Sequence, residues 1–427
     1  MPRNRSADSP GGGIRLVHIT TVPESLGFLR GQIAYMTVRG VSVAAISSPG
    51  KDLAEFVERE GVPTYPVAMA RQITPWRDMI SIWRIYRVLR RLRPHIVHAQ
   101  TPKGGLLGTI AAWLARTPVR IYHIRGLPLM TATGARRRLL WSTERVACGL
   151  SHAVLCVSHS VRDVAIAEGL SPPRKITVLL GGSGNGVDAE GRFDPHREPA
   201  ERERTRADLG IPPNAIVIGF VGRVVRDKGV VELAAAWSAL RNAFPEARLL
   251  MVGPLEPQDP IPRDTEDLLR GDPRVHLAGK VRETAPFYAA MDLVVLPTHR
   301  EGFPNVPLEA ASMELPVVAT RIPGCVDAVQ DGVTGTLVPV GASGPLKEAV
   351  EAYLRDAELR RAHGRAGRER VLREFRRESI WAALHAHYRA LLATRGVVDD
   401  SMAPSPDDIS SSGLGGHPRT PAEPTYR

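Results

Sequence analysis

Short apolar runs alternate with stretches of helical periodicity along most of this chain, and that alternation limits its possible folds more than any other feature. The runs at 14–20 and 41–48 are typical of buried parallel strands, and a helical stretch from Gln32 lies between them. A repeated strand–helix–strand order favours a parallel sheet with helices on both faces. The pattern therefore predicts an α/β protein with a doubly wound sheet.

The alternation occurs twice. The first set of strands ends with the run at 175–182, and a second set extends from 215–222 to 334–340. The intervening segment 189–214 is polar, charged and rich in proline, as a linker containing a helix would be. With 427 residues the chain is too long for one ordinary core. We place a boundary near residue 190 and predict two Rossmann-like doubly wound lobes that face a cleft.

The composition changes at both ends of this pattern. A final amphipathic helix is predicted to cross back to the first lobe, and the segment after it holds too much Pro, Ser, Gly and Asp to bury a core. The predicted organisation is a flexible leader (1–13), a first lobe (14–190), a second lobe (191–378), the crossing helix (379–395) and a disordered tail (396–427).

The charge of the chain predicts an anionic partner. There are 56 Lys and Arg residues against 45 Asp and Glu residues, a formal net charge of +11. Nucleic acid, a phosphorylated metabolite or an acidic membrane surface would each suit this excess. Aromatic residues make up only 5% of the chain, and no helix–turn–helix, RNP or zinc motif is present. These absences argue against a nucleic-acid partner.

The cysteines and the lack of long apolar segments indicate a compartment. Cys148, Cys156 and Cys325 are an odd number without metal-ligand spacing. They argue against a disulfide framework or a zinc site, and for a reducing environment. The leader lacks the apolar run of a signal peptide, and no stretch approaches the roughly 20 apolar residues that span a bilayer. We expect a cytoplasmic protein that contacts membranes only peripherally.

Residues that follow the strands of the second lobe are candidates for ligand binding, because open parallel sheets bind ligands beyond the carboxyl ends of their strands. Gly222 and Arg223 follow the first of these strands, and Lys228 precedes the next helix. The two cations would suit a diphosphate, and the glycine would let the backbone approach it. The alternative is two solvated charges in a surface loop.

A second candidate lies later in the same lobe, where Glu301 and Glu309 flank a Gly-Phe-Pro-Asn turn. Asn305 is predicted to cap a helix whose first turn contains Glu309, so an interaction of about 0.3–1 kcal/mol with the helix dipole explains Glu309 without a ligand. Glu301 gains nothing from that helix, but an ionised carboxylate there can accept hydrogen bonds from sugar hydroxyls. The backbone N–H groups from Gly302 to Val306 would seat a phosphate or a hydroxyl.

Taken together, these motifs resemble the large retaining glycosyltransferase family called family 4, whose two-lobed architecture is named GT-B. The likeness covers most of residues 14–395 and depends on the combination of motifs. They are Gly222-Arg223, Lys228-Gly229, Glu301-Gly302-Phe303, Glu309-Ala310, Pro316 to Ala319, Asp331-Gly332 and Thr334-Gly335.

The resemblance implies that the second lobe binds a nucleotide sugar, expected to be a UDP-sugar, as a substrate, without a cofactor or metal. It implies that Arg223 and Lys228 hold the diphosphate, that Glu309 binds the ribose hydroxyls and that Glu301 acts at the transferred sugar. Preplaced cations and N–H donors suit the charge that develops on the leaving diphosphate. The residues implied for the donor are Gly222, Arg223, Lys228, Gly302, Phe303, Pro304, Asn305, Val306 and Glu309.

The same resemblance implies that the first lobe binds the acceptor. His98, Gln100 and Lys103 lie between a strand and a helix, and His123 and Arg125 end another strand. Many family members have histidines where Gln100 and Arg125 stand here, so a catalytic histidine does not carry over directly. A structural role for His98 is the alternative. The catalytic candidates are Glu301, Arg125 and His98, and the acceptor-binding candidates are Gly27, Gln100, Lys103 and His123.

Two segments of the first lobe, 102–108 and 124–128, resemble a subgroup that builds capsular and exopolysaccharide repeats on a lipid diphosphate. The expected function is therefore transfer of a sugar, with retention of configuration, to a lipid-diphosphate-linked glycan. The main alternative is a glycosyltransferase that acts on a small-molecule acceptor. A dinucleotide-binding protein is disfavoured, because no G-x-G-x-x-G motif follows the first strand. Residues 181–188 resemble the hinge of the family, although an Asn-Gly turn alone would explain them.

Two basic segments of the first lobe are candidates for contact with an anionic membrane. The segment 75–94 spaces Trp83, Tyr86 and other apolar residues at helical intervals and carries six arginines, and 134–145 adds Arg136 to Arg138. Trp and Tyr could lie near lipid headgroups with the arginines on the polar side. The alternative for 75–94 is a helix that covers the sheet and has a solvated basic face.

Overall fold

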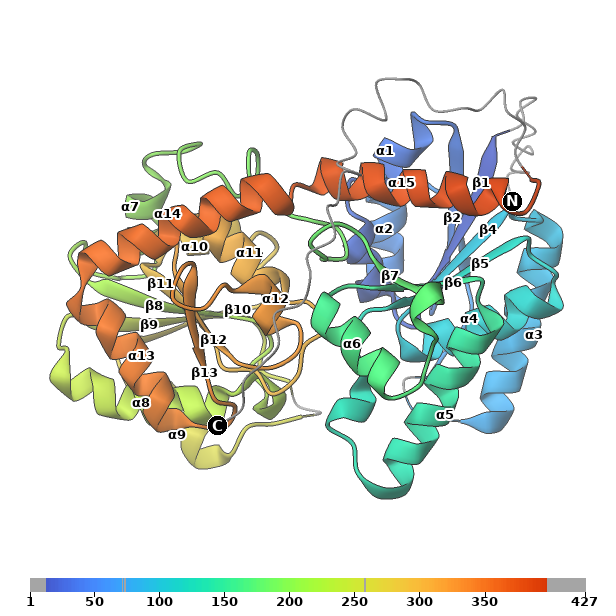
Figure 1. Ribbon diagram of the computed structural model, residues 1–427. Helices are drawn as coiled ribbons and strands as arrows, with labels where there is room; N and C mark the ends of the chain where they lie inside the picture. The colour runs from blue at the N-terminus through green and yellow to red at the C-terminus, as the bar shows by residue number, and fades with distance from the viewer. Residues whose placement is uncertain (1–12, 71, 73, 257–258, 398–427) are drawn as a thin grey trace, which may run out of the picture.

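The computed structural model of the chain describes residues 13–70, 72, 74–256 and 259–397, and within them the chain forms two α/β lobes side by side (Figure 1). Both sheets are parallel throughout, with helices on their faces. The prediction of two doubly wound Rossmann-like lobes is confirmed. Apart from residues 13, 396 and 397, the predicted leader and tail lie outside the described residues.

The first lobe is built on seven strands in the order β3-β2-β1-β4-β5-β6-β7. Every residue of β4 is buried, as expected for a strand covered by helices on both faces. The strands are β1 (Ile14–Ile19), β2 (Val41–Ser47), β3 (Thr64–Pro66), β4 (Ile96–Gln100), β5 (Val119–Ile124), β6 (Ala153–Cys156) and β7 (Ile176–Val178). The helices are α1 (Gln32–Thr37), α2 (Lys51–Glu60), α3 (Pro75–Leu92), α4 (Pro102–Leu114), α5 (Gly134–Leu150) and α6 (His159–Ala167), with short 3-10 helices η1 (Pro23–Leu29), η2 (Pro128–Met130) and η3 (Pro173–Lys175).

The second lobe has six strands in the order β10-β9-β8-β11-β12-β13. The strands are β8 (Ile216–Val221), β9 (Ala247–Val252), β10 (Val275–Gly279), β11 (Leu293–Leu296), β12 (Val317–Thr320) and β13 (Gly335–Val338). The helices are α7 (Glu201–Asp208), α8 (Val230–Ala243), α9 (Arg263–Gly271), α10 (Ala285–Ala290), α11 (Asn305–Ser312), α12 (Cys325–Ala328), α13 (Ser343–Arg355) and α14 (Ala357–Glu374), with the 3-10 helix η4 (Arg226–Lys228). Helices α13 and α14 are elements that the strand–helix alternation does not single out.

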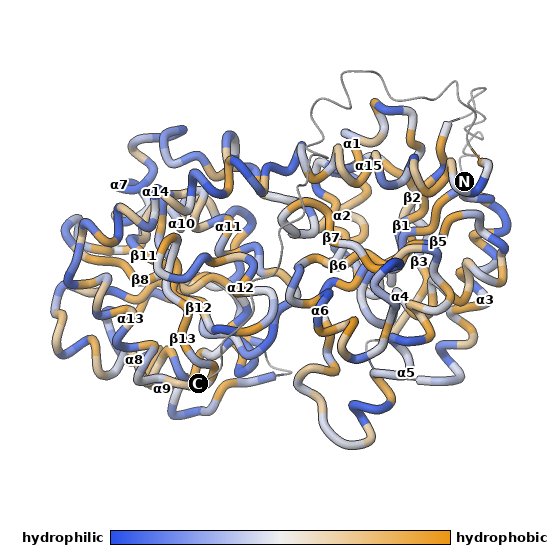
Figure 2. Tube along the Cα trace, in the orientation of Figure 1, coloured by the Kyte–Doolittle hydropathy of each residue, from blue (hydrophilic) through white to orange (hydrophobic). Residues whose placement is uncertain are grey.

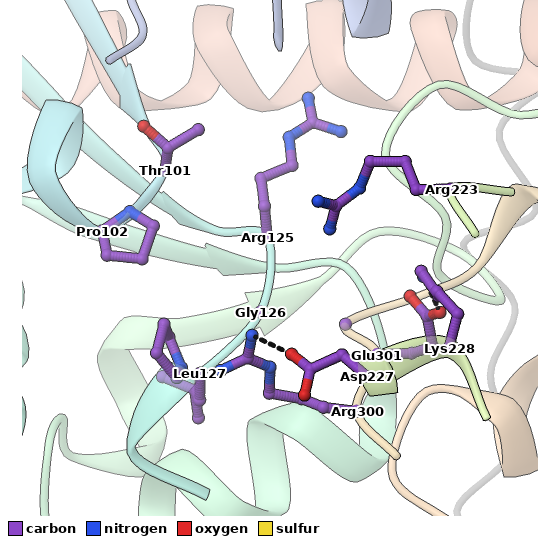
Figure 3. Close-up of a pocket in the computed structure, with 12 residues that line it drawn as sticks. Thr101, Pro102, Arg125, Gly126, Leu127, Arg223, Asp227, Lys228, Arg300 and Glu301 are labelled. Carbon is purple, nitrogen blue, oxygen red and sulfur yellow. Dashed lines mark hydrogen bonds and ion pairs between the residues drawn. The ribbon is translucent and has the colours of Figure 1, made fainter. Parts of the chain in front are cut away.

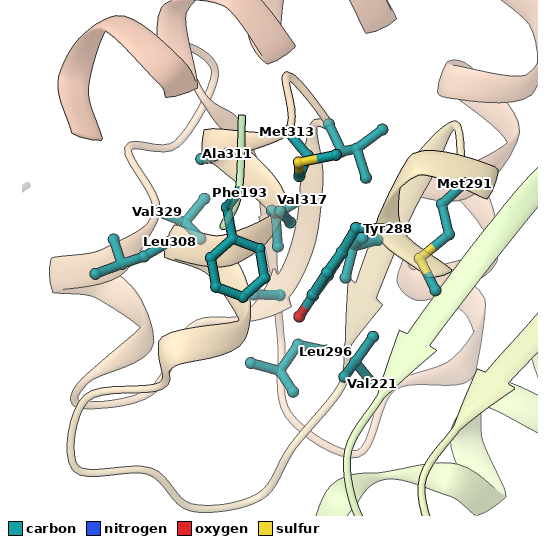
Figure 4. Close-up of a cluster of buried hydrophobic side chains, with 14 of the residues drawn as sticks. Phe193, Val221, Tyr288, Met291, Leu296, Leu308, Ala311, Met313, Val317 and Val329 are labelled. Carbon is teal, nitrogen blue, oxygen red and sulfur yellow. The ribbon is translucent and has the colours of Figure 1, made fainter. Parts of the chain in front are cut away.

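Apolar side chains from the strands and covering helices form the cores of both lobes. The strands are mainly hydrophobic, whereas hydrophilic residues gather in loops and on outer helices (Figure 2). In the second lobe one cluster packs Phe193 against Tyr288 beside β11 and α11, with ring centroids 5.9 Å apart (Figure 4). This packing places the Tyr288 hydroxyl against α11, the helix that follows the predicted sugar-binding turn.

The chain crosses between the lobes twice, and the two crossings lie together. Helix α15 (Arg377–Ala393) follows α14 along one side of both lobes and packs Leu384 and Tyr388 into the core of the first lobe (Figure 1). The outgoing segment meets the chain just before α15, since the N–H of Val187 donates to the carbonyl oxygen of Phe375 at 2.9 Å. Gly186 has a φ of +65°, and a Cβ there would lie 2.6 Å from the Cα of Arg377. The close approach of the crossings therefore requires glycine.

Helix α3 covers the first sheet and also exposes large apolar side chains. Ser81, Ile85 and Leu89 are its buried residues. Its solvent-facing side carries Trp76 and Trp83, which are 77% and 54% exposed. The alternative of a helix that covers the sheet therefore fits the inner face of α3, and contact of its outer face with a membrane stays a prediction. No helix in the described part of the chain combines the length and apolar character needed to cross a membrane. All three cysteines are buried and unpaired.

Candidate active site

A cleft lies between the lobes, at the carboxyl ends of strands from both sheets (Figure 3). Its volume is about 250 Å³, a little below the range of roughly 300–1,000 Å³ that is typical of ligand pockets. The first lobe lines it with Thr101, Pro102, Arg125, Gly126, Leu127 and Pro128, and the second lobe with Arg223, Asp227, Lys228, Arg300, Glu301 and Gly302.

The cations of the second lobe that line the cleft each have an acidic neighbour. Lys228 forms an ion pair with Glu301, and Arg300 pairs with Asp227 at 3.3 Å (Figure 3). Arg223 is half exposed, and its guanidinium lies 3.9 Å from a carboxylate oxygen of Glu256. The predicted diphosphate clamp and one of the two predicted acids thus face the same cleft. Asp227 and Arg300 were not singled out from the sequence, although each lies next to a residue that was.

The backbone of the Gly-Phe-Pro-Asn turn touches the first lobe. A Cβ at Gly302 would lie 1.9 Å from the carbonyl oxygen of Arg125, so only glycine permits this approach. The Ser158 hydroxyl donates to the Gly302 carbonyl oxygen at 2.8 Å. Farther from the cleft, the backbone N–H of Gly324 donates to the Ser160 hydroxyl at 2.7 Å. These contacts hold Glu301 next to the residues that end β5.

Two details of the predicted helix after this turn are wrong. Pro304 is the N-cap of α11, and Asn305 is its first helical residue rather than its cap. Glu309 therefore lies in the second turn, where the interaction with the helix dipole is weaker. Pro304 has extended backbone angles, φ −74° and ψ 132°, so the helical conformation starts at Asn305.

Glu309 is bound by a residue of the same lobe. The hydroxyl of Tyr288, in α10, donates to Oε2 of Glu309 at 2.9 Å. Burial raises the pKa of the Glu309 carboxyl above its usual range, and the hydrogen bond from Tyr288 opposes that rise. Glu309 does not line the cleft described above, so it and Glu301 occupy different surroundings.

The other predicted donor-binding residues have different surroundings. Gly222 directly follows β8 and has a φ of +150°. The Phe303 ring packs on Phe375, with centroids 5.5 Å apart, so its side chain serves the core. Pro304, Asn305 and Val306 form the start of α11, where the first N–H groups of a helix have no partner within the helix.

Arg125 extends from the end of β5 into the cleft. Its Nε and Nη2 both donate to Oε1 of Gln100, at 2.9 and 2.6 Å. The guanidinium also lies over the Phe28 ring, 4.7 Å from its centroid. Burial lowers the pKa of Arg125 to about 10, so the side chain remains a cation at neutral pH.

His98 and His123 lie behind the cleft rather than in its lining. His98 is 1% exposed, and its two ring nitrogens meet the Tyr388 hydroxyl at 2.5 Å and Nδ1 of His123 at 3.1 Å. Burial holds the pKa of both histidines well below their usual range, so both rings are neutral. This surrounding is that of a structural histidine, the alternative considered for His98.

Lys103 and Gly27 also lie outside the cleft lining. Lys103 pairs with Asp78 at 2.7 Å and donates to the carbonyl oxygen of Gln72. It thereby fixes the start of α3 beside the start of α4. Gly27 is an exposed residue of η1, and a Cβ there would have no heavy atom within 4 Å.

Within residues 13–70, 72, 74–256 and 259–397, no three or more His, Cys, Asp or Glu side chains lie close enough to hold a metal ion.

Two family models match the two lobes. The model described as glycosyl transferase 4-like domain matches residues 28–182, and that described as glycosyl transferases group 1 matches residues 215–356. The matches cover β2–β7 of the first lobe and β8–β13 of the second, including the residues that line the two sides of the cleft.

Curated relatives match over most of the chain. The capsular polysaccharide biosynthesis glycosyltransferase CapM of Staphylococcus aureus is 34% identical over 378 residues, which are 88% of this chain and 97% of the relative. The UDP-Gal:alpha-D-GlcNAc-diphosphoundecaprenol alpha-1,3-galactosyltransferase of Escherichia coli is 25% identical over 331 residues, 76% of this chain and 84% of the relative.

Among solved structures, Anabaena HepE in complex with UDP and glucose superposes with a TM-score of 0.73 at 19% identity, covering 89% of this chain and all of that one. A sucrose-phosphate synthase from Thermosynechococcus elongatus superposes with a TM-score of 0.72 at 19% identity, over 89% of this chain. At this identity the likeness supports the fold, and the fold is GT-B.

Proposed function

The chain belongs to glycosyltransferase family 4, and from that premise we propose that it moves a sugar from a nucleotide-diphosphate sugar to a glycan carried on a lipid diphosphate. The proposed nucleotide is UDP. The observation that carries the proposal is the cleft, where Arg223, Lys228 and Glu301 of the second lobe face Arg125 of the first.

The second lobe is proposed to bind the donor. A diphosphate between Arg223 and Lys228 would accept charge-assisted hydrogen bonds, each worth about 1.5–3 kcal/mol. Lys228 is held by Glu301 through an ion pair, so the same contact presents the cation to the phosphates and the carboxylate to the sugar hydroxyls. As the anomeric bond breaks, the negative charge that grows on the leaving diphosphate is stabilised by these preplaced cations without reorganisation. On this basis the reaction needs no divalent metal.

We propose that the anomeric configuration is retained because the acceptor hydroxyl attacks the anomeric carbon from the same face that the diphosphate leaves. The first-lobe residues that line the cleft in the described structure include no carboxylate, so none of them is suited to form a covalent glycosyl intermediate. Same-face attack keeps the acceptor hydroxyl beside the departing phosphate, whose oxygen can take the proton.

The first lobe is proposed to bind a lipid-diphosphate acceptor. The name of the Escherichia coli relative specifies a diphosphoundecaprenol-linked acceptor, and the name of CapM specifies capsular polysaccharide biosynthesis. These names, together with the cationic first-lobe side of the cleft, support a lipid-linked glycan over a small-molecule acceptor.

The donor proposal is tested by thermal shift with UDP-, GDP-, ADP- and dTDP-sugars, because a bound ligand raises the melting temperature with its saturation. A UDP-sugar should give the largest shift. Glu309→Ala removes the carboxylate that the family resemblance assigns to the ribose hydroxyls, so it should abolish turnover and leave the melting temperature of the free protein within a few degrees. No shift with any of the four donors would contradict the proposed donor site.

The acceptor proposal is tested by comparing two acceptors that carry the same glycan, one on an isoprenyl diphosphate and one on a short water-soluble aglycone. Transfer to the first at low concentration, with a higher KM for the second, is the expected result. Equal KM values for the two would favour the small-molecule alternative.

We also propose that the enzyme docks peripherally on the inner face of the cell membrane through the outer face of α3, α4 and α5. Residues 75–151 contain fourteen Lys and Arg residues against two acids, Asp78 and Glu144. Asp78 is paired with Lys103, and Glu144 is buried. Trp76 and Trp83 project from α3 among these arginines. A cationic surface with exposed tryptophans suits an anionic leaflet.

A further inference from the structure

Arg125 differs from the other cations of the cleft because it has no acidic partner. Lys228, Arg300 and Arg223 each have a carboxylate oxygen within 3.9 Å. In the described parts of the chain, no carboxylate lies at ion-pairing distance from Arg125, and its contacts are the neutral Gln100 amide and the Phe28 ring. A partly buried guanidinium without a counter-charge carries a desolvation cost that an incoming anion would offset.

The backbone at Gly184 leaves the space that the Arg125 guanidinium occupies. A Cβ at Gly184 would lie 1.6 Å from Nη1 of Arg125, so the guanidinium occupies space that only glycine leaves free. Gln100 receives hydrogen bonds from Nε and Nη2. The N–H groups of Nη1 and the second N–H of Nη2 remain for a ligand, in the planar geometry that matches phosphate oxygens.

A buried hydrogen-bond chain fixes the direction of Arg125. Nε2 of Gln100 meets Nδ1 of His18 at 2.9 Å, and these two residues are 0% and 1% exposed. Burial, with the charge of Arg125, lowers the pKa of His18 to about 3, so the ring is neutral. A neutral ring with an unprotonated Nδ1 accepts from the amide nitrogen of Gln100 and turns the amide oxygen towards Arg125.

We propose that Arg125 forms a second phosphate site on the first-lobe side of the cleft, and that Gln100 and His18 are positioning residues that hold its guanidinium towards that phosphate. The inference rests on the proposed function, which supplies two diphosphates, one in the donor and one in the acceptor. The backbone of Arg125 touches Gly302, the residue after Glu301. The second phosphate site therefore adjoins the place where the sugar would pass from the donor to the acceptor.

The ligand is tested by calorimetric titration of the intact protein with UDP, with farnesyl diphosphate at saturating UDP, and with inorganic pyrophosphate. Two variants remove the site by different means: Arg125→Gln removes the charge, and Gly184→Ala displaces the guanidinium. Arg174→Gln, an exposed arginine of the same lobe in η3, is the matched control. Loss of one charge-assisted contact predicts affinity at least tenfold weaker in both variants and unchanged in the control.

The three probes separate the sources of the phosphate. A tenfold loss confined to farnesyl diphosphate assigns the site to the acceptor, and a loss confined to UDP assigns it to the donor; either supports the site. Affinities within twofold of the wild type for all three probes, with unchanged melting temperatures, would overturn it. Pyrophosphate binding that depends on Arg125, in a protein that binds no nucleotide sugar, would reject the proposed function and keep this inference.

The positioning role is tested at His18 by a pair of variants. His18→Leu removes the acceptor for Gln100, whereas the Asn side chain in His18→Asn can place an oxygen near the position of Nδ1. The expected result is a tenfold rise in KM for the phosphate-bearing substrate in His18→Leu, little change in kcat, and recovery in His18→Asn. An equal KM in His18→Leu and wild type would remove His18 and Gln100 from the proposal.

Discussion

The two lobes share one architecture but differ in how far their cationic side chains are paired with carboxylates. In the second lobe, Arg202 and Arg206 both pair with Asp292, and the cations that line the cleft also have carboxylate neighbours. In the first lobe, Arg125 meets only neutral groups, and the α3–α5 face carries arginines with almost no acids. Charges that are paired within the protein stabilise the fold or hold one another in place. Charges left unpaired remain available to anions from outside.

The largest effect is expected where the paired charges of the second lobe are broken. Asp292 accepts from Arg202 at 2.7 Å, from Arg206 at 2.8 Å and from the backbone N–H of Val217 at 2.7 Å. Asp292→Ala leaves the 3%-exposed Arg206 without its counter-charge, which predicts a loss of about 3–5 kcal/mol. Urea unfolding measures this. Asp163→Ala, in an exposed pair of the first lobe, is the control and should change stability by about 0.5 kcal/mol or less.

The next effect concerns a second-lobe cation proposed to serve a ligand. Arg223→Ala should lower kcat/KM by about 100- to 1,000-fold, because a preplaced donor to the leaving diphosphate is lost. Arg226→Ala, an exposed arginine of the same loop that does not line the cleft, should stay within about twofold. Steady-state kinetics with the best donor measures both. Similar activity of the two variants would show that the loop contributes only diffuse charge.

The third prediction concerns Glu144, the buried acid of the basic first-lobe face. Burial raises the pKa of Glu144 to about 7, although the Tyr122 hydroxyl donates to it at 2.6 Å. The unfolded chain therefore loses this proton at lower pH than the folded protein, and stability falls from about pH 4.5 to about pH 7. Glu144→Gln should remove that slope and be more stable at pH 8 by on the order of 3 kcal/mol.

Chemical unfolding of wild type and Glu144→Gln between pH 4.5 and pH 8 measures this difference. The amide oxygen of glutamine keeps an acceptor for the Tyr122 hydroxyl, so the comparison isolates ionisation. A slope of equal size in both proteins would mean that Glu144 is ionised in the folded state and does neutralise part of the basic face.

The smallest predicted effect is at the membrane. Trp76→Ser with Trp83→Ser, or Arg136→Gln with Arg138→Gln, should weaken co-sedimentation with anionic vesicles about tenfold. Arg137 is left intact because it pairs with Glu168 at 2.6 Å. Arg263→Gln with Arg361→Gln, two exposed arginines of the second lobe that have acidic partners, is the control and should bind as the wild type does. Unchanged binding in both first-lobe pairs would contradict docking through α3–α5.

Much of the second-lobe side of the candidate site could be predicted because each of its members lies shortly after a strand. Arg223 and Lys228 follow one strand and Glu301 follows another, so their arrival at a common sheet edge depends only on strand order in a parallel sheet. The first-lobe candidates have no such constraint. His98 and Gln100 are two positions apart in β4, yet His98 contacts Tyr388 and Gln100 contacts Arg125. These contacts join residues that are 290 and 25 positions apart in the sequence.

His18 is a second residue whose proposed role could not be predicted from the sequence near it. It lies within an apolar run, and nothing beside it in the sequence distinguishes it from a structural histidine. Its role becomes visible only through Gln100, 82 positions away. The sequence likewise predicts that Lys103, at the start of a helix, binds the acceptor. In the fold, however, Lys103 forms an ion pair with Asp78 of α3.

The sequence by itself determined the two parallel sheets and the motif that places a carboxylate at 301, because these depend on periodicity and on spacing within one strand–loop–helix unit. Only the tertiary structure decided that Arg125 reaches the cleft while His98 is buried behind it, and that Gly184 leaves room for the guanidinium. Those outcomes depend on side chains from distant segments competing for the same volume. Local spacing carries no record of that competition.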